Sequence, residues 1–206
     1  MAEQADPVRD AAADLPVTDR AVLHTGKVFD LVGEQVDLGA GGVVYREFLA
    51  HPGAVAIVAL DEADRVALVR QYRHPVRAYL WEVPAGLLDV SGEPPAAAAQ
   101  RELAEEADLV ADTWHTLVDF ATTPGGSDER IRIFLARDLH PVPEADRYQR
   151  EAEELDMPLR WVDLDEALAA VLSGRLHNPS AVAGILAAHA ARASGWQSLR
   201  PADAPR

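Results

Sequence analysis

Three glutamates, Glu102, Glu105 and Glu106, are spaced i, i+3 and i+4 within the segment RELAEE. If the segment is helical, this spacing places the three carboxylates on one face within a single turn. Like charges at that spacing repel by about 0.2–0.5 kcal/mol per pair, and Arg101, four residues before Glu105, can offset only one of them. Because clustered hard oxygen ligands suit Mg²⁺ or Mn²⁺, the pattern indicates a divalent cation site.

A plainer interpretation of the same residues is a solvated helix surface, which is usual for glutamate pairs on alanine-rich helices. The surrounding sequence favours a functional site instead. The stretch GLLDVSGEPPAAAAQRELAEEADL resembles the Nudix box, whose pattern is Gly, five residues, Glu, seven residues, then Arg-Glu-apolar-x-Glu-Glu-x-Gly-apolar. The positions that fill this pattern are Gly86, Glu93, Arg101, Glu102, Leu103, Glu105, Glu106 and Leu109.

The box departs from the Nudix pattern at two places. Six residues instead of five separate Gly86 from Glu93, so the loop is one residue longer, and Asp108 replaces the second glycine. That position often needs a left-handed residue to end the helix, and Asp tolerates this conformation better than most residues. Neither departure removes a candidate metal ligand.

The resemblance implies a division of roles among the box residues. Glu102 and Glu106 are expected to be the principal metal ligands, with Glu105 in support and the backbone carbonyl of Ala85 as a further ligand. Glu93 and Arg101 are expected to pair and hold the loop against the helix, in a box that begins at Gly86. The implied cofactor is Mg²⁺, with Mn²⁺ as a possible substitute, and bound cations would attract a pyrophosphate to an otherwise acidic site.

Composition excludes several classes of function. The 206 residues carry a formal charge of −15, which repels nucleic-acid backbones and anionic membranes, so we expect neither as a partner. There is no cysteine, which excludes disulfides and thiolate zinc sites. No stretch of about 18 apolar residues is present, and the acidic N-terminus lacks a signal core, so a cytoplasmic protein is expected.

Hydrophobic patterning predicts an α+β fold with an N-terminal β-rich segment, and the resemblance to the Nudix box implies that it is the α/β/α sandwich of that family. We expect flexible tails at 1–18 and 195–206, the β-rich segment at 19–50 and the catalytic domain at 51–194. Pro94 and Pro95 open a strong helix, because proline is tolerated in a first turn. Strands are expected at 21–38, 41–49, 54–60, 65–73, 116–122, 130–136 and 159–163, the third and fourth joined as a hairpin, and helices at 94–108, 163–174 and 178–194.

Beyond the box, the sequence resembles the ADP-ribose pyrophosphatase subgroup over roughly residues 20–193. QYRHPV followed by LWEVPAG matches the strand and entry loop of that subgroup, and Pro124, fifteen residues after Leu109, matches its marker proline. The expected reaction is hydrolysis of ADP-ribose to AMP and ribose 5-phosphate, with Mg²⁺ activating the attacking water.

The segment EAEELDMPLRWV resembles the acidic loop that supplies the catalytic base of this subgroup. A mobile carboxylate on such a loop can take the proton of the attacking water. Matched to the subgroup, Glu154 is the expected base, with Glu153 in reserve. Arg73 is expected either to clamp a phosphate or to form a surface salt bridge. Glu82 is expected to help hold ribose or a catalytic water.

The N-terminal strands resemble the element that crosses to a partner subunit in this subgroup, so we expect a homodimer. Phe29 and Arg46 would then contact the adenosine end of the substrate. Two other interpretations remain open at this point: the same chemistry on another nucleoside diphosphate sugar or an oxidised nucleoside diphosphate, and a non-catalytic ADP-ribose sensor. The box carboxylates and the absence of a basic extension argue against the sensor.

Overall fold

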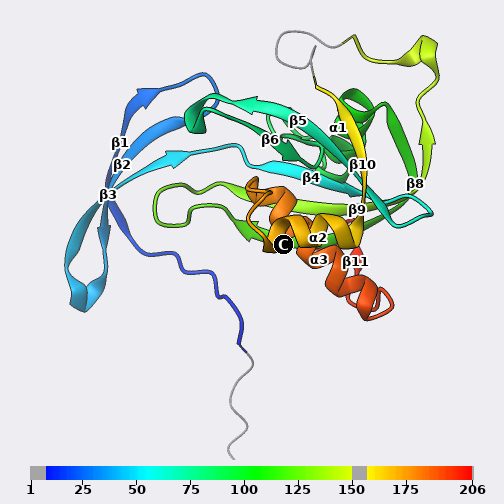
Figure 1. Cartoon of the computed structure of the whole chain (residues 1–206). Helices are drawn as coiled ribbons and strands as arrows, with labels where there is room; N and C mark the ends of the chain where they lie inside the picture. The colour runs from blue at the N-terminus through cyan, green and yellow to red at the C-terminus, as the bar shows by residue number, and fades with distance from the viewer. Residues whose placement is uncertain (1–7, 150–156, 206) are drawn as a thin grey trace, which may run out of the picture. The chain divides into compact units, whose positions relative to one another are not determined.

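Two units, divided between Ala50 and His51, make up the chain. The computed structural model describes residues 8–149 and 157–205 (Figure 1). All residues of the Nudix-like box fall in the second unit. None of the helices in these described ranges is long and apolar enough to cross a membrane.

The first unit is an antiparallel sheet in the order β1-β2-β3, with a 3-10 turn, η1, after β2. Its elements are β1 (Val17–Thr25), β2 (Asp30–Asp37), η1 (Gly39–Gly41) and β3 (Val43–Ala50). Every residue of β1 is exposed, and burial is confined to the middle of β2. The ring of Tyr45 lies over Gly33, since a Cβ at that position would be 2.1 Å from the tyrosine hydroxyl oxygen.

The second unit is built on two sheets. One has five strands in the order β11-β8-β9-β4-β7, and the other has three in the order β10-β5-β6. The strands are β4 (Ala54–Ala59), β5 (Arg65–Arg73), β6 (Ala78–Glu82), β7 (Ala85–Leu87), β8 (Leu109–Ala121), β9 (Arg130–Pro141), β10 (Leu159–Asp163) and β11 (Arg200–Pro201), with 3-10 turns η2 (His74–Val76) and η3 (Glu144–Asp146). Only β4 and β9 pair in parallel, so the larger sheet is mixed.

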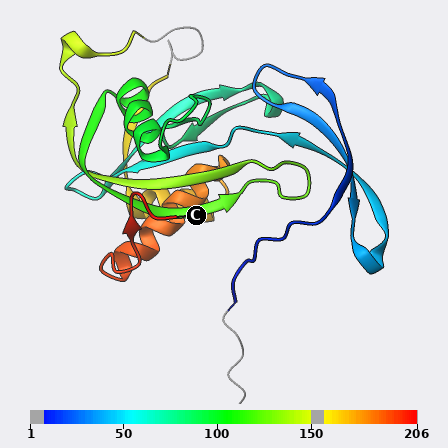
Figure 2. The ribbon, with the colours of Figure 1, turned by 180° about the vertical axis from the view of Figure 1, so that it is seen from behind.

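Helices cover both faces of the five-stranded sheet. Alternate residues of β4 point to opposite faces, so Val55 and Ile57 pack with Leu103 of α1 (Pro95–Ala107), whereas Val58 packs with Ile185 on the other side. That other face is covered by α2 (Leu164–Leu172) and α3 (Pro179–Ala193). Figures 1 and 2 show α1 and the α2–α3 pair on opposite sides of the strands. The predicted α+β sandwich is therefore confirmed.

The expected hairpin between the third and fourth strands is not formed as predicted. Only an isolated bridge, Leu60 to Val66, joins β4 and β5, and the two strands enter different sheets. Both edges of β4 are already occupied, by β7 on one side and β9 on the other. The turn between them therefore redirects the chain, with Asp64 in the left-handed region at φ 56°.

The prediction of a flexible tail over 195–206 is wrong for its central part. β11 pairs with β8, and Arg132, which is only 4% exposed, donates to the carbonyl oxygen of Ala204 at 2.6 Å. Asp119 accepts from both Arg132 and Arg200 at 2.7 Å. Burial opposes ionisation of Asp119, but these two guanidinium groups hold its pKa below the usual range. A buried arginine needs such partners, and the C-terminal segment supplies one of them.

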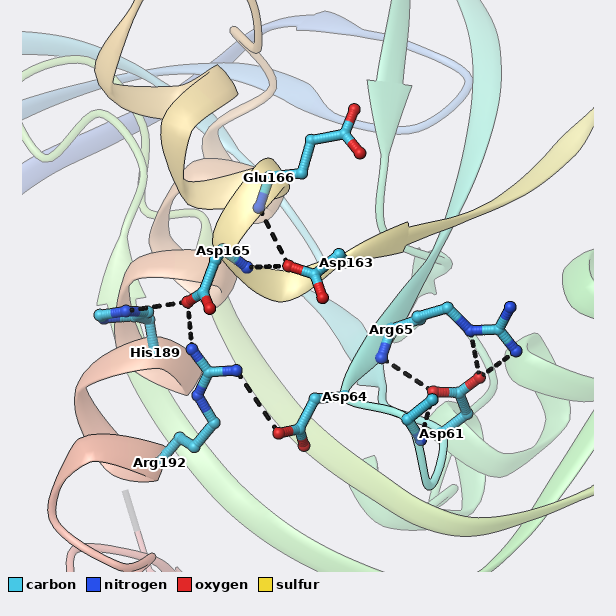
Figure 3. Close-up of polar contacts among 9 residues, drawn as sticks. Asp61, Asp64, Arg65, Asp163, Asp165, Glu166, His189 and Arg192 are labelled. Atoms are coloured by element: carbon cyan, nitrogen blue, oxygen red, sulfur yellow. Dashed lines mark hydrogen bonds and ion pairs between the residues drawn. The ribbon is translucent and has the colours of Figure 1, made fainter.

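A second ionic cluster ties α2, α3 and the β4–β5 turn together (Figure 3). Arg192 of α3 contacts Asp165 at the start of α2 and lies 3.4 Å from Asp64 in the turn. His189 adds a contact to Asp165 at 3.3 Å, and Asp163 caps α2 by accepting from the backbone N–H of Asp165 at 2.9 Å. The cluster therefore attaches the start of α2, which directly follows β10, to α3 and to the β4–β5 turn.

Candidate active site

The side chain of Glu102 lies directly over the backbone of Gly86. A Cβ built on Gly86 would be only 2.0 Å from the carboxyl carbon of Glu102, so no other residue fits there without displacing the glutamate. Gly86 belongs to β7, which pairs with the N-terminal half of β4. The glycine at the start of the box is therefore required by the close approach of α1.

Glu106 attaches the same helix to the neighbouring residue of β7. Its Oε2 accepts the backbone N–H of Ala85 at 2.9 Å, and the residue is only 8% exposed. Two predicted ligands of α1 thus rest on two consecutive residues of one short strand. This arrangement brings Glu102 and Glu106 to the backbone of Ala85 and Gly86, and Ala85 is the residue whose carbonyl is expected in the ligand set.

Arg101 connects the box loop to the helix face. It bonds both oxygens of Glu93, at 3.1 and 3.2 Å, and its Nη1 donates to Glu102 at 2.6 Å and Glu105 at 3.1 Å. The expected Glu93–Arg101 pair is present, but the expectation that Arg101 helps only one helix carboxylate was too narrow. The bonds from Arg101 hold the pKa of Glu93 below its usual value, and Glu93 in turn raises the pKa of Arg101.

Arg101 bonds three of the four box carboxylates, Glu93, Glu102 and Glu105, and this cluster of four negative charges is suited to a cation. Carboxylate and carbonyl oxygens are the donors that Mg²⁺ and Mn²⁺ prefer. Within residues 8–149 and 157–205, however, no group of three or more His, Asp or Glu side chains is arranged to hold a metal ion. The donor chemistry fits a hard divalent cation, while Arg101 and the N–H of Ala85 engage the carboxylates.

Arg73 and Glu82 form a two-point ion pair on the face of the three-stranded sheet that α1 covers. Arg73 donates to the two oxygens of Glu82 at 2.9 and 2.7 Å. Ala67 packs in the α1 core cluster, and Arg73, six residues further along β5, shares its face by strand alternation. Glu82 is 2% exposed, whereas the side chain of Arg73 is 42% exposed. Of the two roles expected for Arg73, the salt bridge is present, and its partner Glu82 orients a guanidinium that remains accessible.

Sequence analysis missed Gln71 as a candidate site residue. It lies between Val69 and Arg73 on the same face of β5 and is 8% exposed, so its amide is a buried polar group. The sequence gives little sign of this burial, because Gln71 lies between Arg70 and Tyr72 near the polar end of the strand RVALVRQYR. A buried amide on the strand face that also carries Arg73 is the kind of polar group that orients a bound ligand.

Residues 50–181, more than half of the chain, match the family model described as the NUDIX domain. The chain belongs to the Nudix family. An ADP-ribose pyrophosphatase of Mycobacterium tuberculosis is 47% identical over 94% of this chain and 91% of its own length. An ADP-ribose pyrophosphatase of Bacillus subtilis is 36% identical over 76% of this chain and 82% of its own. The fold resembles a crystal structure of an ADP compounds hydrolase, with TM-score 0.71, 20% identity, and coverage of 91% of this chain and 99% of that chain.

The remaining Nudix-based expectations fall in several places. Asp108 ends α1 in the left-handed conformation, at φ 54° and ψ 35°, as the substitution for glycine requires. Pro124 is exposed in the β8–β9 loop, the turn of residues 122–129 between those strands.

In the first unit, Phe29 is exposed just before β2, and Arg46 of β3 donates to the carbonyl of Tyr45 at 2.9 Å. The candidate bases Glu153 and Glu154, like Glu151 and Asp156, lie outside the described residues.

Replacing Gly86 by alanine should lower activity by about 10²-fold, because the added methyl group must push Glu102 out of position. Mn²⁺ binding, followed by calorimetry, should weaken in parallel. The control is Glu102→Ala. If G86A acts through Glu102, the double variant will be no worse than Glu102→Ala alone. Additive losses would show that Gly86 matters for another reason.

Proposed function

We propose that this Nudix protein hydrolyses the pyrophosphate bond of ADP-ribose, giving AMP and ribose 5-phosphate. The observation that carries the proposal is the carboxylate face of α1, packed through Glu102 and Glu106 onto Ala85 and Gly86. The two relatives named ADP-ribose pyrophosphatase support the choice of substrate, because they match most of the chain.

The proposed cofactor is Mg²⁺, for which Mn²⁺ can substitute. Glu102, Glu106 and the carbonyl of Ala85 would hold it, with Glu105 in support. When bound, the cation neutralises charge on the phosphate oxygens and makes water a stronger acid and nucleophile. Arg101 would then retain Glu93, which keeps the loop attached to the helix while the helix carboxylates bind the metal.

The phosphate side of the site is assigned to residues of β5 and β6. The exposed guanidinium of Arg73 would contact a phosphate oxygen, oriented by the buried carboxylate of Glu82. Gln71, buried on the same face, would add a hydrogen bond from its amide. These contacts offset the repulsion that an acidic protein exerts on an anionic substrate.

Glu154 is the proposed general base, with Glu153 in reserve. It would take a proton from the water as the water oxygen bonds to one phosphorus atom. The bond from that phosphorus to the bridging oxygen then breaks, and the second phosphate leaves with the bridging oxygen. General-base assistance of this kind contributes typically about 10²–10⁴-fold to a rate.

We also propose that the enzyme is a homodimer in which the first unit completes the site of the partner. The support is one face of that unit: Val43 and Tyr45 lie two residues apart on β3 and so share a face, and they are 57% and 48% exposed. Exposed apolar side chains that share a face of a sheet are expected at an interaction surface. Phe29 and Arg46 would then contact the adenosine end of the substrate.

The proposed reaction is tested with a substrate panel of ADP-ribose, UDP-glucose, GDP-mannose and 8-oxo-dGDP, each with Mg²⁺ and with Mn²⁺. We expect the highest kcat/KM on ADP-ribose, with AMP and ribose 5-phosphate identified as products. Excess EDTA should abolish activity, since the site has only hard oxygen donors. Full activity in chelator would refute the metal assignment, and preference for another nucleotide would refute the substrate.

Two conservative variants separate a metal ligand from a base. Glu106→Gln should weaken metal binding and lower the rate together, because it removes a charged oxygen. Glu154→Gln should leave metal and substrate binding nearly intact and lower kcat by about 10²-fold or more. Single-turnover kinetics and Mn²⁺ titrations measure the two effects. Near-normal kcat for Glu154→Gln would move the base to Glu153, and weakened metal binding in that variant would make Glu154 a ligand.

The proposed dimer is tested by light scattering and by deletion of residues 1–50. The full chain should scatter as a dimer, and the deletion should abolish hydrolysis while the second unit stays folded by circular dichroism. Val43→Asp, which places a charge on the exposed face of β3, should weaken association while the second unit stays folded. A full-length protein that is monomeric and fully active would contradict the proposal.

A further inference from the structure

Two acidic residues of the β8–β9 loop converge on His51, the first residue of the second unit. Oδ1 of Asp128 accepts the backbone N–H of His51 at 2.8 Å. Glu129 approaches Nε2 of the His51 ring to 3.6 Å and accepts the hydroxyl of Thr122 at 2.6 Å through its other oxygen. Both ends of the loop are thus attached to one point on the chain.

The ring of His51 carries this attachment towards the Nudix box. Its Nδ1 accepts the backbone N–H of Gly53 at 3.0 Å, and the carbonyl of Gly53 accepts the N–H of Leu88 at 3.0 Å. Gly53 has a φ of 87°, and a Cβ there would lie 3.2 Å from the carbonyl oxygen of Arg130. A chain of hydrogen bonds therefore links the loop, through His51 and Gly53, to the residue that follows β7.

Strand pairing places the loop close to the carboxylates. Leu87 pairs with Ala54, which pairs with Ile131, so the loop leaves the sheet just beyond this row. Neighbouring strands lie about 4.8 Å apart and residues about 3.3 Å apart, so the base of the loop is on the order of 10 Å from Gly86. A substrate with a sugar on each side of its pyrophosphate extends over such a distance.

The tip of the loop, residues 123–126, differs from its base. Its residues are exposed, and a Cβ on Gly125 or Gly126 would meet nothing within 4 Å. The base is fixed by side chains, whereas the tip is an exposed turn with room around its two glycines. Such a division is expected where a loop must be held in one position and still be approached closely.

We propose that His51 is a positioning residue for the substrate: with Asp128 it holds the β8–β9 loop in register with the start of the Nudix box. The loop then contacts the part of the substrate that extends beyond the metal-binding carboxylates. This inference rests on the proposed function. It also makes Asp128 and Glu129 anchors of the loop.

The test compares alanine with the conservative residue at each position. Asp128→Ala and His51→Ala should raise KM for the nucleotide sugar by about two- to tenfold, the value of one hydrogen bond, with kcat within twofold of wild type. Asp128→Asn retains the acceptor for His51 N–H, and His51→Asn can still accept Gly53 N–H, so both should restore KM. The matched control is Asp112→Ala, which removes an Asp–His contact of 3.0 Å to His140 on the same two strands.

Hydrogen exchange supplies a readout independent of turnover. The backbone N–H of Thr122 donates to the backbone carbonyl oxygen of Glu129 at 3.2 Å. Its hydrogen should exchange faster in the two alanine variants and not in the control. Unchanged KM and unchanged exchange in both alanine variants would overturn the inference, as would a loss confined to kcat. If ADP-ribose is not the substrate, the proposed function fails separately, and KM is compared on the panel substrate that is cleaved.

Discussion

The contact between Glu102 and the backbone of Gly86 is the constraint on which the site depends. It sets the distance of α1 from β7, because a helix carboxylate reaches the strand only where the strand has no side chain. Glu106 and Ala85 repeat the attachment one residue earlier. Both contacts concentrate negative charge at the strand, so Arg101 must bind Glu93 and two helix carboxylates at once. The geometry of the loop, the helix and the strand therefore follows from one close approach.

Packing on the other faces of these elements keeps that approach fixed. α1 meets the sheet through Ala98, Ala99 and Leu103, all fully buried, and the two alanines allow the helix to lie close. On the opposite side, Gly184 of α3 has no room for a side chain, since a Cβ would lie 2.8 Å from Val58. β4 thus lies between two helices, α1 and α3, that both pack closely against it through small residues. Rigid elements of this kind hold site residues more precisely than loops do.

Much of this architecture could be predicted from the sequence, where local pattern and spacing decide the outcome. The proline pair and alanine run fixed the start of α1, and Asp108 occupies the left-handed position inferred for it. The i, i+3, i+4 glutamates share the expected face. The separation of β4 from β5 was not predictable from their own residues, because it depends on β7 and β9 occupying both edges of β4.

Other features could not be predicted from the sequence because they join residues far apart in the chain. His51 reads as an isolated histidine, and its partners Asp128 and Glu129 are known only once β8 and β9 are paired. Gln71 looked like part of a motif, and its burial emerged only from the sheet. The tail was assigned by composition, which cannot show that it supplies Arg132 with a second acceptor beside Asp119.

The C-terminal segment also bears on the order in which the second unit folds. Ala204 is 72 residues from Arg132, and Ala202 is 86 residues from Thr116, whose hydroxyl it accepts at 3.3 Å. Contacts between residues so far apart carry a loop-closure cost, which is one reason why long-range pairing is slow. Until residue 204 has been made, Arg132 has the carboxylate of Asp119 but not the carbonyl of Ala204 to bond. The outer edge of the sheet closes only after the last strand has been made.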